Sequence, residues 1–482
     1  MIDNRTCRFR LVLLHLLLIG TIALTPLPAF SAATIILVNG DGVGEGFNDP
    51  TPAAPVGGNA GTTLGQQRLN AFQYAANLWG AQITSGPQIK ILANFDPLAC
   101  TATSGVLGAA GPLWVWHDWT GAPKINTWYP VALANKLYGA DLTPGTTPDD
   151  SEIQATFNSN LGQTDCLTDV SFYLGLDGNH GNNIDLVAVL LHEFAHGLGF
   201  LTWTDSDGTT GEYFDGRPFV YDYFLSDTTT NKVWTGMTDS ERAASAINPR
   251  GVVWTGPNVT TEVPFVLDPG TPELLITSPD SVAGIYMVGS ASFGPALSSP
   301  GVTGKLVPVV DQRDGTGLAC DPLKGKNVKA VNGNIALIDR GVCTYVTKVK
   351  NAQNAGAIGV VIADNAAGSP PYSLPGTDPT ITIPSVRITQ ADGVKLKDVP
   401  KSKSKNEIAT LRINLSQFSG ADASGRMILH TPNPYEGGSS VSHWDTIAFP
   451  NQLMEPFLNP DETHSVSPPY DLTLPLLKDI GW

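Results

Sequence analysis

The 482-residue sequence contains few charged residues, few cysteines and, beyond residue 24, no long apolar run. Charged residues make up 15% of the chain, against roughly 25% in an average soluble protein. The 28 Lys and Arg are outnumbered by 44 Asp and Glu, which gives a net charge of −16. Binding to nucleic acid or to an anionic membrane surface requires clustered positive charge. The composition therefore argues against both kinds of partner.

The amino-terminal residues have the three-part pattern of a secretory signal peptide. Arg5, Arg8 and Arg10 precede an apolar run over Leu11–Leu24, and small residues follow over Ala29–Ala33. The run holds about 14 residues, fewer than the roughly 20 that a membrane-spanning helix needs. We expect residues 1–33 to be removed, and the remaining chain to be secreted, with no membrane attachment.

Removal of Cys7 with the signal peptide leaves four cysteines. An even number of cysteines in an exported chain indicates disulfides. Four cysteines allow three pairings, of which proximity and domain boundaries favour Cys100–Cys166 and Cys320–Cys343. C-x-x-C spacing is absent, which argues against a cysteine metal site.

Residues 34–274 are expected to form an α+β region. The predicted elements are a strand at Thr34–Val38, a helix from Thr63 to Trp79 and a strand at Gln88–Asn94. Residues 101–180 show no clear period apart from a strand-like Val170–Leu174.

The pattern changes near residue 275, where short β-branched runs begin. Strands are predicted at Gly284–Val288, Leu306–Val310, Ile335–Ile338, Gly359–Ile362 and Ile381–Val386, with a helix at Tyr345–Ala355. A strand, a helix and a buried strand in succession indicate a β–α–β unit, so residues 275–418 are expected to be a separate α/β-type module. In the last part, residues 419–482, Arg426–Leu429 is predicted as a strand and Leu472–Ile480 as an apolar segment.

The segment Asn183–Phe200 has the strongest helical pattern of the chain, with Asn183 or Asp185 available as its cap and Gly197 and Gly199 at its end. It contains His192-Glu193-Phe194-Ala195-His196, an H-E-x-x-H motif. Four residues turn a helix by about 400°, so both imidazoles project from one face and can bind one Zn²⁺. Glu193 then lies where it can act as general base toward a zinc-bound water.

A catalytic zinc requires a third protein ligand, and three alternatives present themselves. The compact pattern H-E-x-x-H-x-x-G-x-x-H has its Gly at Gly199, but its ligand position is Thr202, a poor ligand. A downstream carboxylate, as in thermolysin-like enzymes, would be Glu212. The third alternative is a distant histidine, of which His443 is followed eleven residues later by Met454.

The combination of H-E-x-x-H-x-x-G-F, a large insertion, Ser442-His443-Trp444 and then a methionine resembles the leishmanolysin-type metzincins. This resemblance implies His192, His196 and His443 as zinc ligands, Glu193 as the base and Met454 as the residue of the Met-turn beneath the zinc. It also implies a metzincin-like zincin catalytic domain of the α+β class.

The inserted module resembles a second family. Gly333–Cys343, with Lys348–Ala352 and Ala355-Gly356-Ala357 after it, is similar to the protease-associated (PA) domain that interrupts many secreted proteases. The resemblance implies the Cys320–Cys343 bridge and a module that binds substrate or another protein. It implies a catalytic domain split between residues 34–274 and 419–482.

Together these features predict a secreted zinc-dependent endopeptidase that acts on proteins or peptides. Two alternatives stay open: a non-catalytic exported binding protein on a degenerate protease scaffold, and a thermolysin-like hydrolase that uses Glu212. Two acidic loops, Asp41–Asp49 and Asp205–Asp215, suggest Ca²⁺ as a second cofactor, because calcium prefers clustered oxygen ligands.

Overall fold

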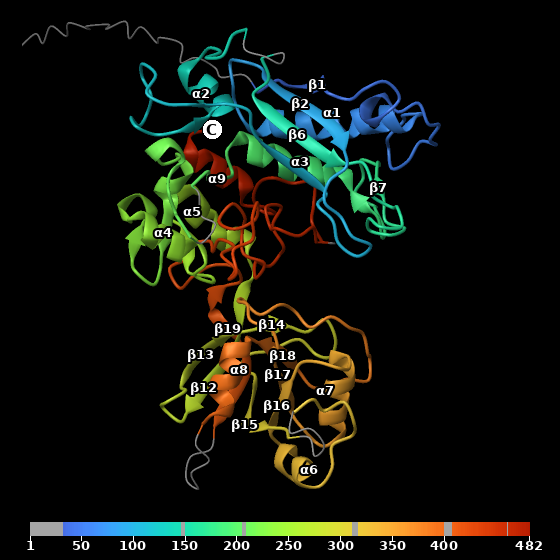
Figure 1. Ribbon diagram of the computed structural model, residues 1–482, viewed down its shortest axis with the longest axis vertical. Coiled ribbons are helices and arrows are strands. Elements are labelled where there is room, and N and C mark those ends of the chain that lie inside the picture. Colours follow the sequence, from blue (N-terminus) through green and yellow to red (C-terminus); the bar gives the residue numbers. More distant parts are fainter. Residues whose placement is uncertain (1–31, 146–149, 205–208, 311–316, 400–406, 460) are drawn as a thin grey trace, which may run out of the picture.

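The computed structural model describes residues 32–145, 150–204, 209–310, 317–399, 407–459 and 461–482. Nearly all of the expected signal peptide, residues 1–31, lies outside the described residues. Figure 1 shows two parts: an inserted part, whose first strand begins at Pro269 and whose last strand ends at Phe418, and a main part formed by the described residues on either side of it. The main part combines blue, green and red segments, so both ends of the described chain belong to it.

The main part contains a four-stranded sheet in the order β1-β2-β6-β3. β1, β2 and β6 run parallel, whereas β3 pairs with β6 in the antiparallel direction and forms one edge. The bounds of these strands are Ile35–Asn39 for β1, Ile89–Asp96 for β2, Gly108–Pro112 for β3 and Ile153–Asn158 for β6. β3 and β6 lie in the stretch for which the sequence predicted no element.

Two helices pack on this sheet and on each other: α1 (Leu64–Gln82) against β1, and α3 (Leu186–Leu198) against β6 and β3. α3 begins after Asp185, whose carboxylate accepts a hydrogen bond from the N–H of Val187. It ends at Gly199, whose φ of +124° favours glycine. The helix is buried nearly all round, because its residues other than the motif are mainly Leu, Val and Ala.

Shorter elements complete the main part. They are β4 (Val115–Trp116), β5 (Tyr129–Pro130), α2 (Val131–Tyr138), β7 (Phe172–Tyr173), β8 (Ile184–Asp185), β9 (Leu225–Asp227), β10 (Lys232–Val233), α4 (Asp239–Ala246), β11 (Val252–Trp254), α5 (Pro257–Val266) and α9 (Thr473–Ile480). The strand predicted at Arg426–Leu429 is wrong: Met427, Ile428 and Leu429 form only isolated bridges, each to a different segment.

The inserted part is built on an eight-stranded sheet in the order β13-β12-β19-β15-β16-β17-β18-β14, with a parallel centre from β15 to β18. Its elements are β12 (Pro269–Ser278), β13 (Gly284–Met287), β14 (Gly289–Ser290), β15 (Val302–Pro308), α6 (Lys326–Val331), β16 (Ile335–Asp339), α7 (Tyr345–Asn354), β17 (Gly359–Ala363), β18 (Ser385–Ile388), α8 (Gln390–Lys397) and β19 (Ile408–Phe418). α7 between β16 and β17 is the predicted β–α–β unit.

The chain enters and leaves the inserted part at one place. β12 begins at Pro269, before the predicted boundary at residue 275, and Pro269 pairs with Phe418 at the end of β19. Because the two strands are antiparallel neighbours, the insertion keeps the flanking segments of the main part close together. Those segments share one hydrophobic core, in which Phe200 packs on Trp444 with ring centroids 4.9 Å apart.

Two disulfides cross-link the structure: Cys100–Cys166 in the main part and Cys320–Cys343 in the inserted part. They are the two pairs that the sequence favoured. Among the described residues, no helix has the length and apolar character required to cross a bilayer.

Candidate metal centre

The two histidines of the motif are fixed on α3 by backbone carbonyls. Nδ1 of His192 lies 2.7 Å from the carbonyl oxygen of Leu453, and Nδ1 of His196 lies 2.8 Å from that of Phe200. A carbonyl can only accept a hydrogen bond, so Nδ1 carries the proton in both rings. Nε2 of each ring therefore has a free lone pair, the form in which imidazole binds a metal.

His443 meets these rings from the carboxy-terminal segment. Its Nδ1 lies 2.9 Å from the carbonyl oxygen of Ser439, which fixes the same tautomer. Its Nε2 lies 3.1 Å from Nε2 of His192 and 3.2 Å from Nε2 of His196, and the two helical Nε2 atoms are 3.1 Å apart. The structure thus brings together three residues that span about 250 positions of the chain.

Three lone pairs at this separation repel one another unless a cation lies between them, since none of the three Nε2 atoms carries a proton to share. For Zn–N bonds of about 2.0–2.1 Å, tetrahedral geometry separates two ligand atoms by about 3.3–3.4 Å. The observed triangle is therefore close to the size that zinc requires. Within the described ranges, these are the only three His, Cys, Asp or Glu side chains that converge in this way.

Burial keeps the three imidazoles neutral. Loss of solvent lowers the pKa of His192 to about 4 and that of His196 to about 3. Burial, followed by the neighbouring imidazoles, also holds the pKa of His443 well below its usual value. Neutral imidazoles are the ligand form, so the site is preorganised for a metal at neutral pH.

Glu193 follows His192 on α3 and is 6% exposed. Burial raises the pKa of Glu193 to about 8, while a hydrogen bond from the N–H of Ala110 on β3 acts in the opposite direction. The carboxylate also lies against Gly108 of the same strand: a Cβ there would be only 2.8 Å from Oε1 of Glu193. The edge strand β3 therefore fixes the position of the Glu193 carboxylate.

Met454 is fully buried and lies next in sequence to Leu453, the residue whose carbonyl holds His192. The carbonyl of Met454 itself accepts a hydrogen bond of 2.8 Å from the N–H of Trp444, the neighbour of His443. The backbone of the Met454 segment thus contacts His192 and Trp444, the residue that follows His443.

Thr202 occupies the ligand position of the compact pattern but serves another purpose. Its hydroxyl donates to the buried Asp222, at 2.6 Å, and its N–H donates to the hydroxyl of Ser442, at 3.2 Å. Glu212, the alternative ligand, is exposed and does not belong to the converging group. The third position of the triangle is filled by His443.

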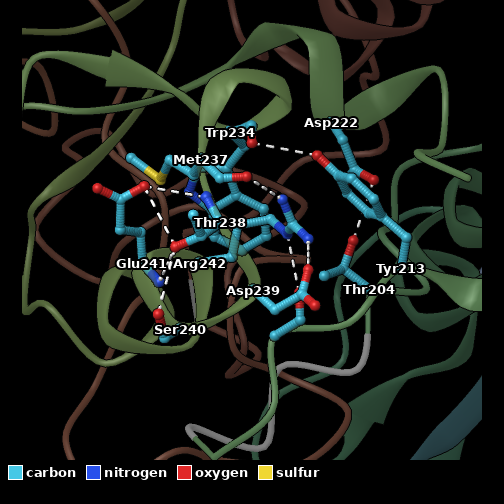
Figure 2. Close-up of polar contacts among 11 residues, drawn as sticks. Thr204, Tyr213, Asp222, Trp234, Met237, Thr238, Asp239, Ser240, Glu241 and Arg242 are labelled. Carbon is cyan, nitrogen blue, oxygen red and sulfur yellow. Dashed lines mark hydrogen bonds and ion pairs between the residues drawn. The ribbon is translucent and has the colours of Figure 1, made fainter. Parts of the chain in front are cut away.

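The segment after α3 is anchored by a buried polar cluster around Arg242 of α4. Figure 2 shows the guanidinium of Arg242 over the ring of Tyr213, 3.6 Å from its centroid, and the Thr204 hydroxyl donating to Asp222. The Tyr213 hydroxyl donates to the carbonyl of Trp234, at 3.1 Å. Glu212 precedes Tyr213 and is held in this anchored segment.

The calcium prediction is not supported. In the loop Asp41–Asp49, the two carboxylate oxygens of Asp41 accept the backbone N–H groups of Phe47 and Phe95, at 2.6 and 2.8 Å. Asp49 accepts from Thr51 and pairs with Arg68. These oxygens are used by the protein itself and do not converge on a shared point. Asp205 and Asp207 of the second loop lie outside the described residues.

Sequence reasoning missed the parts of the site that are backbone. The carbonyls of Leu453, Phe200 and Ser439 fix the three tautomers, and the N–H of Ala110 holds the Glu193 carboxylate. Backbone groups leave no signature in side-chain identity. A glycine within a strand often marks a close approach of another group, but Gly108 could not be used in this way because the sequence predicted no strand around it.

Comparison with known proteins identifies the inserted part. Residues 302–396 match the family model of the PA domain. A C5a peptidase of Streptococcus pyogenes is 43% identical over 79 residues, which is 16% of this chain and 6% of that protein. The minor extracellular protease Vpr of Bacillus subtilis is 33% identical over 101 residues, 20% of this chain and 12% of that protein.

A further relative is a plant protein, a receptor homology region, transmembrane domain- and RING domain-containing protein of Oryza sativa subsp. japonica. It is 38% identical over 107 residues, 22% of this chain and 19% of that protein. These matches thus span less than a fifth of the length of each relative.

Among solved structures, a zinc aminopeptidase from Bacillus subtilis is 28% identical and an aminopeptidase from Aneurinibacillus sp. strain AM-1 is 27% identical. Each comparison covers 31% of both chains, with TM-scores of 0.23 and 0.24. TM-scores of this size do not establish a shared fold. The family match is specific to the inserted part, and we conclude that this chain contains a PA domain, located in the sequence between His196 and His443.

Proposed function

We propose that this protein is a secreted zinc-dependent endopeptidase whose zinc ligands are His192, His196 and His443. The observation that carries the proposal is the triangle of three unprotonated Nε2 atoms, 3.1–3.2 Å apart. Glu193, whose carboxylate is held by β3, follows His192 directly in the sequence. Three protein ligands and one open position are typical of catalytic zinc, whereas structural zinc has four protein ligands.

Bound zinc supplies a Lewis acid that polarises a carbonyl and lowers the pKa of water toward about 7. The Glu193 carboxylate accepts a proton from the attacking water and then donates it to the departing amine nitrogen. A nearby cation favours the ionised carboxylate, and it therefore opposes the burial that raises the pKa of Glu193 in the metal-free protein. The N–H of Ala110 acts in the same direction and keeps the carboxylate oriented.

We further propose a metzincin-like organisation split by the PA domain, in which Met454 belongs to the Met-turn. The buried position of Met454, its backbone link to Trp444 and the link from Leu453 to His192 support this assignment. The joined strands β12 and β19 support it as well, because they allow an insertion without separating the two halves of the site.

The test is a peptide with a fluorophore and a quencher, acetylated at its amino end and amidated at its carboxyl end. Only an endopeptidase cleaves such a substrate internally. We expect the zinc-loaded protein to cleave it, chelation to abolish cleavage, and Glu193→Gln to reduce kcat by about 10²–10⁴-fold with zinc content unchanged. Zinc binding without cleavage of any peptide by the wild type would instead favour the non-catalytic binding protein.

Secretion is part of the proposal. It is supported by the signal-peptide pattern of residues 1–33. One of the matching relatives, the protease Vpr, is named as an extracellular protein. Mass spectrometry of the protein recovered from culture medium should find a mature chain that begins close to residue 34. A chain that retains residues 1–33 would contradict this part of the proposal.

A further inference from the structure

The PA domain touches the main part at the loop that leads to His443. Ser369 and Asn433 form an antiparallel bridge with two backbone hydrogen bonds, 2.9 Å from the N–H of Ser369 and 2.7 Å from the N–H of Asn433. Three residues further along each segment, the hydroxyl of Tyr372 donates to Oε1 of Glu436, at 3.1 Å. The contact thus combines a backbone bridge with one side-chain hydrogen bond to a carboxylate.

Glu436 is also the first residue of the turn that holds the third histidine. Its carbonyl accepts the N–H groups of Ser439 and Ser440, at 3.1 and 2.9 Å, and its own N–H donates to the Ser440 hydroxyl, at 2.9 Å. The carbonyl of Ser439 in turn accepts Nδ1–H of His443. The orientation of the third imidazole therefore depends on this turn.

A second route joins Glu436 to His443 through His430. Oε2 of Glu436 lies 3.2 Å from Nε2 of the buried His430. The N–H of His430 donates to the carbonyl of His443, at 2.9 Å, and its carbonyl accepts the N–H of Val441, at 2.7 Å. One carboxylate is thus connected to the PA domain by one oxygen and to the backbone of the third histidine by the other.

Hydrogen bonds between Glu436, Ser439 and Ser440 close the turn, but its tip is open to solvent. Gly437 and Gly438 form its tip, both are exposed, and nothing lies within 4 Å of a Cβ placed on either. Glycine has more backbone freedom than any other residue, so its ordering costs the most conformational entropy. The hydrogen bond from Tyr372 therefore adds a restraint from outside the turn to the hydrogen bonds within it.

We propose that Glu436 is a positioning residue for His443 and that Tyr372 of the PA domain holds it in place, so that the PA domain contributes to zinc retention. This inference rests on the proposed function, because it takes the three histidines as zinc ligands. The PA domain then stabilises the loop that carries His443, in addition to any binding of substrate or of another protein.

Tyr372→Phe tests this with little disturbance. The side chain is 56% exposed, and its ring, 5.6 Å from the guanidinium carbon of Arg387, is retained in the variant. Only the hydroxyl that donates to Glu436 is lost. Glu436→Ala removes both links, and Glu436→Gln keeps an oxygen that accepts from Tyr372. Tyr138→Phe, at the end of α2, is a matched control with 48% exposure.

The readout is the dissociation constant of zinc in the full-length protein, measured by competition with a chromogenic chelator. Loss of an outer-shell partner typically weakens metal binding about 10–100-fold. We expect about tenfold weaker binding for Tyr372→Phe and Glu436→Ala, near-wild-type binding for Glu436→Gln, and no change for Tyr138→Phe. At saturating zinc, KM for a peptide should not change.

Melting of the zinc-free protein separates positioning from a general structural role. A positioning role predicts that Tyr372→Phe leaves the melting temperature without zinc unchanged and reduces the rise that zinc produces. If Tyr372→Phe and Glu436→Ala both bind zinc within twofold of wild type, the inference is overturned, but the proposed function is not. A wild-type protein that binds no zinc would overturn the proposed function, and the inference with it.

Discussion

A substitution at Gly108 on β3 offers a direct way to move the Glu193 carboxylate, the proposed base, without changing a proposed zinc ligand. A Cβ at this position would lie 2.8 Å from Oε1 of Glu193 and 2.9 Å from its Cγ. Ordinary van der Waals contacts begin at 3.4 Å, so Gly108→Ala must increase the first separation by about 0.6 Å (3.4 − 2.8). A misplacement of about 1 Å in a catalytic group can cost about 10²-fold in rate.

We therefore expect Gly108→Ala to reduce kcat about 10- to 100-fold on the blocked peptide. Zinc content should not change, because Glu193 is not a ligand. Gly111→Ala is the matched control, since it lies on the same strand and nothing is within 4 Å of its Cβ position; its kcat should stay within twofold of wild type. Steady-state kinetics with metal analysis of each variant measures both. Wild-type kcat in Gly108→Ala, or loss of zinc from it, would refute the reasoning.

Three further predictions concern stability and metal binding. Burial raises the pKa of Glu152 to about 7, so the folded protein holds a proton that the unfolded chain releases, and stability falls as pH rises from about 4.5 to 7. The difference in unfolding free energy between Glu152→Gln and wild type should shift in favour of the variant by up to about 3 kcal/mol as pH rises from 4.5 to 8. Urea titrations at each pH measure this difference, and a difference that does not change with pH would contradict the prediction. Replacement of both Cys320 and Cys343 by Ser should lower the unfolding free energy by about 3 kcal/mol, because the cross-link is lost. Calorimetry measures this change, and a thermal unfolding transition identical to that of wild type would contradict the prediction. Thr202→Val should leave zinc affinity within twofold of wild type, because the Thr202 hydroxyl bonds Asp222, whereas tenfold weaker binding would indicate a ligand role.

The sequence predicted α3 well because each of its signals acts locally. Asp185 caps it, apolar residues fill it, and Gly199 ends it at a positive φ. The β–α–β unit of the inserted part was predictable for the same reason: β16 and β17 are continuous apolar runs on either side of an amphipathic helix.

The edge strand β3 could not be predicted, because Gly108–Pro112 reads Gly-Ala-Ala-Gly-Pro. Such residues have low strand propensity and no alternation. They form a strand because β6 offers a pairing edge, which is a tertiary cause. The strand predicted at Arg426–Leu429 was wrong for the opposite reason. Its residues are suitable for a strand, but the residues with which they pair belong to three different segments.

His443 lies between these cases. Outside the motif and the expected signal peptide the sequence has five histidines, namely His117, His180, His430, His443 and His464. Their spacing does not choose among them, and only the pattern around Ser442, Trp444 and Met454 favoured His443. The structure adds what no pattern contains, namely that the β12–β19 pair closes the insertion and that the Glu436 turn orients the ring. Long-range geometry of this kind is set by packing.

The most direct test is crystallography of the zinc-loaded protein with data on both sides of the zinc absorption edge. We expect one strong anomalous peak per chain, about 2.0–2.1 Å from Nε2 of His192, His196 and His443, and its disappearance in His443→Ala. A peak bound by His192, His196 and Glu212, with His443 beyond bonding distance, would contradict the account.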